Sequence, residues 1–172
     1  MAGRLISPNA CWLLLPPIAL CSLDFGLTFY GQSAEYWSGN YSAVNEISPS
    51  FHYYFTIHPL VAAGAALLWM AIFSAMVLLL SEMLALTLVM AIVIGHMAGA
   101  ATWLAYRFHS YQSCGLLFLV TSALVVFTFK RGQNSDGSAA FDWQRTGLPG
   151  WVRWVVIAAL AVLPTWWFLV PR

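Results

Sequence analysis

Long apolar runs, separated by shorter polar stretches, make up most of this chain. Five runs occur, near residues 10–31, 57–80, 83–106, 112–129 and 151–170. A helix needs about 20 predominantly apolar residues to cross the hydrocarbon layer of a bilayer, and each run is close to that length. The pattern therefore predicts an all-α fold: a polytopic membrane helical bundle of five transmembrane helices, forming a single integral membrane domain over residues 1–172.

The connections between these runs differ strongly in length and character. Residues 81–83 are the only break between the second and third runs, which predicts a tight helical hairpin. Residues 32–56 form a long polar and aromatic connection, and residues 130–150 are charged and rich in glycine. We expect the latter to be a surface loop, because glycine and small polar residues interrupt regular structure.

Two features of the first run bear on its interpretation. The Pro16-Pro17 pair predicts a kink, because proline removes a helical N–H donor and its ring clashes with the preceding turn. The run also follows Arg4, as the apolar core of a secretory signal would. Leu20, which precedes a cysteine, is however too large for the small residue expected at a processing site. We therefore expect the run to be retained as a true span.

Composition supports a membrane protein and excludes some partners. Hydrophobic residues make up 61% of the chain and charged residues only 8%, whereas soluble domains carry roughly 25% charged residues. The formal net charge is only +1, and no basic stripe is present that could neutralise a phosphate backbone. The expected partners are the lipid bilayer and other membrane protein subunits, with no nucleic acid.

The distribution of Lys and Arg predicts an orientation. If the N-terminus is inside, the inner side carries Arg4, Lys130, Arg131, Arg145 and Arg153, and the outer side carries Arg107 and Arg172. An excess of Lys and Arg marks cytoplasmic loops. We therefore expect an N-in, C-out topology, with residues 32–56 outside and residues 130–150 inside. The expected location is a bacterial inner membrane.

Two ionisable residues, Asp24 and His96, lie inside apolar runs. Such groups are costly to bury at membrane depth, so they are usually paired and face the protein interior. Asp24 lies about 10 Å below the outer end of the first run, and His96 about 15 Å below that of the third, at 1.5 Å per residue. We expect the two side chains to meet, directly or through one water or ion.

Further polar residues are predicted in the same outer half of the bundle. They are Thr28 in the first run, Glu35 and Glu46 in the outer loop, and His58 at the start of the second run. Gly95 and Gly99 flank His96 at GxxxG spacing, which allows another helix to approach closely. Because the close-packing features lie in the first three runs, we expect those helices to form the core and the last two to pack at its periphery.

Three functional classes fit these features to different degrees. The small size and apolar faces favour a non-catalytic assembly partner or subunit of a membrane complex. The alternative is an intramembrane metal-dependent hydrolase, in which Asp24, His58 and His96 hold a divalent metal, with Glu46 or Glu35. No HExxH, HxxxH or GxSxG motif supports an enzyme.

The third class is a b-type haem protein, which requires two axial histidines at matched depth on facing helices. His58 and His96 differ in depth by roughly 15 Å. His58 and His109 match in depth but lie at the interface, so haem is not expected. A transporter has no specific support, because no inverted repeat is visible.

Overall fold

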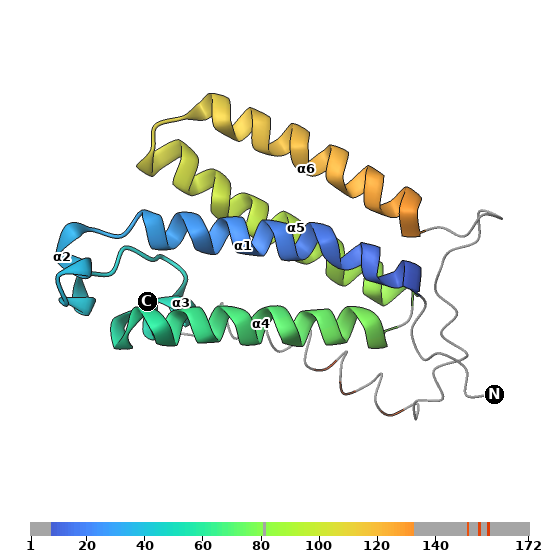
Figure 1. Cartoon of the computed structure of the whole chain (residues 1–172), viewed down its shortest axis with the longest axis horizontal. Coiled ribbons are helices and arrows are strands. Elements are labelled where there is room, and N and C mark those ends of the chain that lie inside the picture. Colours follow the sequence, from blue (N-terminus) through green and yellow to red (C-terminus); the bar gives the residue numbers. More distant parts are fainter. Residues whose placement is uncertain (1–7, 81, 133–150, 152–154, 156–157, 159–172) are drawn as a thin grey trace. The chain divides into compact units, whose positions relative to one another are not determined.

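The computed structural model describes residues 8–80 and 82–132, together with residues 151, 155 and 158, and every regular element between residues 8 and 132 is helical. Figure 1 shows these elements along the chain. In order they are the 3-10 helix η1 (Pro8–Leu14), α1 (Leu15–Tyr30), α2 (Ala34–Trp37), the 3-10 helix η2 (Tyr41–Ala43), α3 (Pro49–Ile57), α4 (Pro59–Leu79), α5 (Glu82–Thr102), the π-helix η3 (Trp103–Arg107) and α6 (Tyr111–Gly132).

Four of these helical segments are long and apolar enough to cross a membrane. Their bounds are Cys11–Tyr30, Pro59–Leu79, Leu84–Arg107 and Tyr111–Arg131. The all-helical fold and the first four predicted spans are confirmed to this extent, and they indicate an integral membrane protein. The predicted fifth span, 151–170, lies outside the described residues apart from the three isolated positions, and residues 133–150 lie wholly outside them.

The Pro16-Pro17 pair lies just after the point where one continuous helical segment changes from 3-10 to α geometry, and the kink expected there stays a prediction. A 3-10 helix ends at Leu14 and α1 begins at Leu15, so both prolines fall in the first turn of α1. The N–H groups of a first turn have no acceptor within their own α-helix, so proline is well tolerated at these positions. Both prolines are fully buried.

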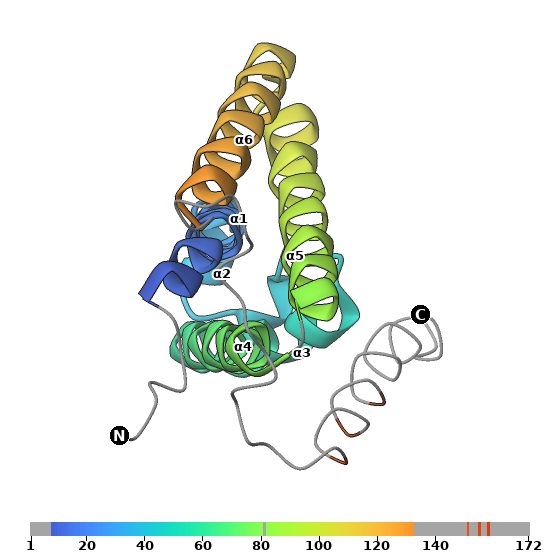
Figure 2. The ribbon, with the colours of Figure 1, turned by 90° about the vertical axis from the view of Figure 1, so that its right-hand side faces the viewer.

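The described residues divide into two compact units, and the first contains residues 8–27, 70–80 and 82–132. Its core is a cluster in which Leu20 of α1, Ala100 of α5 and Leu117 of α6 pack together. Figures 1 and 2 show α1, α5 and α6 lying beside one another in this unit. The expectation that the fourth span lies at the periphery is therefore wrong, because α6 supplies part of the core.

The turn between α5 and α6 has an unusual backbone. The helix widens into η3, where the N–H of Phe108 donates to the carbonyl of Trp103, five residues earlier, at 3.1 Å. His109 then adopts a positive φ of 52°, which is uncommon for a residue other than glycine. This turn reverses the chain, and α5 and α6 run antiparallel (Figure 1).

The second unit contains residues 28–69 and folds around aromatic side chains. Tyr36, Phe55 and Ala62 are fully buried, and the Tyr36 hydroxyl donates to the Phe55 carbonyl at 3.2 Å. The side chain of Gln32 holds Asn45 by two hydrogen bonds, accepting from its N–H at 2.8 Å and donating to its carbonyl at 3.2 Å. The connection predicted as a loop is thus ordered and contains α2, η2 and α3. We refer to residues 32–57 as the cap, a name for this segment alone.

Candidate functional site

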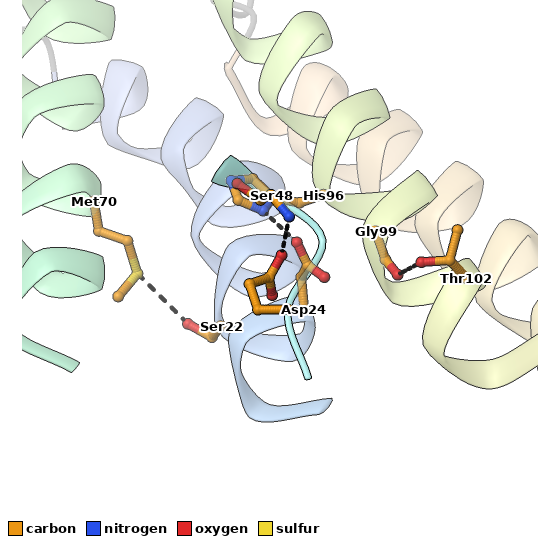
Figure 3. A network of polar contacts seen from close by, with 8 residues as sticks. Ser22, Asp24, Ser48, Met70, His96, Gly99 and Thr102 are labelled. Atoms are coloured by element: carbon orange, nitrogen blue, oxygen red, sulfur yellow. Dashed lines mark hydrogen bonds and ion pairs between the residues drawn. The ribbon is translucent and has the colours of Figure 1, made fainter. Parts of the chain in front are cut away.

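Asp24 and His96 are in direct contact within the first unit. Asp24 lies on α1 and His96 on α5, and the Nδ1 atom of the imidazole is 2.8 Å from Oδ2 of the carboxylate. Figure 3 shows the carboxylate directed toward the imidazole. When the carboxylate is ionised it can only accept hydrogen bonds, and Nδ1 is then the donor of this contact. The contact joins two helices through residues that are 72 positions apart in the chain.

The pair is largely shielded from its surroundings. The side chains of His96 and Asp24 are 15% and 19% exposed, respectively. The ring of Phe25, the residue after Asp24, lies 5.9 Å from the imidazole ring between centroids. Cys21, one helical turn before Asp24, is fully buried. A polar contact in apolar surroundings is stronger than in water, and leaving either partner alone there is correspondingly costly.

Gly99 makes room for the carboxylate on α5. A Cβ atom built on Gly99 would lie 2.6 Å from both carboxylate oxygens of Asp24 and 2.8 Å from its Cγ. Real Cβ atoms essentially never approach other atoms that closely. The carboxylate therefore rests directly against the backbone of α5, three residues beyond His96. Any side chain at position 99 would have to displace it.

The two glycines of the GxxxG spacing play different parts. A Cβ atom on Gly95 would meet nothing within 4 Å, so the close approach expected of both glycines occurs at Gly99 and not at Gly95. The Gly99 carbonyl also accepts a hydrogen bond at 2.6 Å from the hydroxyl of Thr102, one turn later (Figure 3). In the described part of the chain, α1 thus packs closely against only one glycine of the motif, Gly99.

The remaining residues predicted for the site belong to the second unit. Thr28 is buried near the end of α1. The Nδ1 atom of His58 accepts from the N–H of Leu60 at 3.1 Å, which satisfies one of the unpaired donors at the start of α4. The His58 ring also packs edge-on against Tyr41 at 5.1 Å between centroids. His58 thus has local contacts that account for its position.

The two predicted loop carboxylates also have local partners. Glu35 lies in α2 and accepts from the side-chain amide of Asn40. Glu46 accepts from the N–H of Ser48 at 2.6 Å. Among the residues that the structure describes, no three His, Cys, Asp or Glu side chains form a group that could hold a metal ion. The structure therefore gives no support to a metal set of Asp24, His58 and His96.

Sequence reasoning missed the buried tyrosine of the cap. Burial raises the pKa of Tyr36 above its usual value, and the neighbouring Tyr41 raises it further. The density of aromatic residues in 32–56 was a visible signal. Aromatic residues at such positions also occur as simple interfacial belts in membrane proteins, so the sequence did not distinguish the two arrangements.

Comparison of the chain with protein-family models, with curated proteins and with solved structures found no match. The function must therefore be argued from the geometry of the site. That geometry is a hydrogen-bonded acid and imidazole, shielded by apolar neighbours, with the acid packed against a glycine of the opposite helix.

Proposed function

We propose that this protein is a non-catalytic subunit or assembly partner of a membrane complex. In this proposal the contact between Asp24 and His96 fastens α1 to α5. The observation that carries it is the seating of Asp24: on its α5 side the carboxylate lies so close to Gly99 that no methyl group fits. A reacting carboxylate needs space for a substrate atom about 3 Å away. A carboxylate that only holds two helices together needs no such space and can be packed closely.

The depth of Asp24 within its span supports a structural role for its contact with His96. Asp24 lies six residues before the end of its span at Tyr30, which is about 9 Å at 1.5 Å per residue. At such a depth an unpaired ionisable group is costly, and a partner on another helix compensates for that cost. The pair can thus hold the two helices in one register.

The outer faces of the helices support a role in assembly. Large apolar side chains are exposed along α4 and α6, including Leu67, Leu68, Leu116 and Leu119. Exposed apolar surface on a spanning helix can face lipid or a neighbouring subunit. The proposal retains the N-in orientation, which rests on the distribution of Lys and Arg, and it keeps a bacterial inner membrane as the proposed location.

The test compares two substitutions of Asp24 in protein extracted from native membranes in a mild detergent. Asn keeps an oxygen that accepts from the imidazole, whereas Leu has the same branched shape and accepts nothing. We expect the native chain and Asp24→Asn to migrate as a complex larger than the 19.0 kDa monomer, with a second membrane protein identified in it. Asp24→Leu should lose that complex.

Two results would refute the proposal. One is a native chain that remains a monomer under all mild extraction conditions. The other is bound zinc or iron, found by elemental analysis in the native chain and absent from an Asp24→Asn variant that still folds. The second result would instead support the metal-dependent hydrolase, because a metal site there needs the carboxylate as a ligand.

A further inference from the structure

A groove lies between α5 and α6, away from the Asp24 and His96 pair. Its volume is about 970 Å³, and apolar side chains form most of its lining. On α5 these include Leu86, Met90 and Ile94, which follow one another at intervals of four residues and so form one stripe along the helix. Val126 and Phe129 line the facing side on α6. We refer to this feature as the α5–α6 groove.

The length of the groove favours a lipid chain over a transmembrane helix. Leu86 to Ile94 spans eight residues, or about 12 Å along α5. That is close to one leaflet of hydrocarbon, which is half of roughly 30 Å. A partner helix crosses both leaflets and would need a stripe along the full length of the span, from Leu84 to Arg107.

One end of the groove carries a positive charge. Lys130 lines the groove and is exposed. It is next to the last residue of the span Tyr111–Arg131, so it lies where the apolar layer meets the headgroups. The guanidinium of Arg131 is held over the ring of Phe127 at 5.4 Å from the centroid, and neither of these residues lines the groove.

We propose that the α5–α6 groove binds an anionic phospholipid, with one acyl chain along Leu86, Met90 and Ile94 and the phosphate against Lys130. The complementarity is twofold: an open apolar groove one leaflet long, and a cation at the level of the headgroup. Basic pockets between transmembrane helices bind anionic headgroups in this way. This site is independent of the assembly role proposed above.

The test measures lipids that remain bound to the purified chain in detergent by native mass spectrometry. The probes are phosphatidylglycerol, which is anionic, and phosphatidylcholine with the same acyl chains, which is zwitterionic. We expect the native chain to retain phosphatidylglycerol in preference, by about fivefold, the factor that corresponds to about 1 kcal/mol per basic residue near an anionic surface.

Matched variants separate the groove from general surface charge. Lys130→Gln and Arg131→Gln each remove one positive charge, but only Lys130 lines the groove. Lys130→Gln should abolish the preference, while Lys130→Arg and Arg131→Gln should retain most of it. Ala91→Trp fills the groove and should reduce retention of both lipids, whereas Ala75→Trp, at an exposed position of α4 outside the groove, should not.

Four outcomes would overturn the proposal. The first is equal retention of the two lipids by the native chain, and the second is an equal loss of preference in Lys130→Gln and Arg131→Gln. The third is a dimer that Ala91→Trp dissociates while lipid retention is unchanged, which would assign the groove to contact between two copies of the chain. Retention by Ala91→Trp equal to that of the native chain likewise refutes a lipid in the groove.

Discussion

Gly99 and Gly95 offer a matched test of how α1 meets α5, because they lie one turn apart on the same helix. Replacing either by Ala makes the same chemical change. In a helix interior that change alone is favourable by about 0.8–1.0 kcal/mol. Around Gly95 a Cβ atom meets nothing within 4 Å, whereas at Gly99 it would lie 2.6 Å from both carboxylate oxygens of Asp24. The two variants should therefore differ in the sign of their effect on stability.

The expected size of the difference follows from the contact that Gly99→Ala disrupts. Ordinary contact begins near 3.4 Å, so either the carboxylate leaves the His96 imidazole or the two helices separate. Losing a hydrogen bond to a charged group costs about 1.5–3 kcal/mol in soluble proteins, and hydrogen bonds between membrane helices average about 0.6 with a maximum near 1.7 kcal/mol. We expect Gly99→Ala to be less stable than Gly95→Ala by about 1–3 kcal/mol.

The assay is thermal unfolding of both variants in the same detergent. A difference of 1–3 kcal/mol should appear as a Tm lower by roughly 3–10 °C for Gly99→Ala in a chain of this size. Repeating Gly99→Ala in an Asp24→Ala background supplies the control, because without the carboxylate the added methyl group has nothing to displace. Equal Tm values for the two glycine variants would refute the reasoning, as would a penalty that persists after Asp24 is removed.

Three further predictions concern the cap and the topology. Tyr36→Phe removes the hydrogen bond to the Phe55 carbonyl and should lower the free energy of unfolding by about 1 kcal/mol; an unchanged denaturation midpoint would contradict this. Burial raises the pKa of Tyr36 in the folded state, whereas a tyrosine in the unfolded chain ionises near pH 10. The contribution of the Tyr36 side chain to the free energy of unfolding is therefore fully present below about pH 10. It is lost as the pH rises further, because the unfolded chain then releases the proton more readily than the folded one. The stability gap between the native chain and Tyr36→Phe should therefore be constant below about pH 10 and narrow as the pH rises above it, and a gap that stays constant above pH 10 would refute the assignment. Cysteines introduced at Ser42 and Ser138 should react with impermeant reagents from opposite sides of the membrane, and labelling from one side would contradict the N-in, five-span topology.

The sequence was sufficient to predict the first four spans and the contact between Asp24 and His96, for a simple physical reason. A bilayer sets the length of an apolar run, and the cost of an ionisable group at depth implies a partner. The depth of each residue, counted along its helix, then leaves few candidate partners for a buried ionisable side chain. These arguments need only positions along the chain, and they do not depend on how side chains pack.

The features that could not be predicted depend on packing. Apolar residues on α6 look the same in the sequence whether they face lipid or, like Leu117, the core. The GxxxG spacing places two glycines on one face but does not say that only Gly99 receives a carboxylate. The helices of the cap depend on contacts such as Tyr36 with Phe55, which are 19 residues apart, and no local periodicity reports such contacts.

The central claim is that the contact between Asp24 and His96 holds α1 to α5, and a double-mutant cycle tests it most directly. The measurement is the free energy of unfolding in detergent for Asp24→Leu, His96→Leu and the double variant, each relative to the native chain. The cycle cancels whatever else each side chain contacts and isolates the energy of the pair. We predict a favourable coupling of about 0.5–1.7 kcal/mol. Strict additivity of the two substitutions would contradict the account.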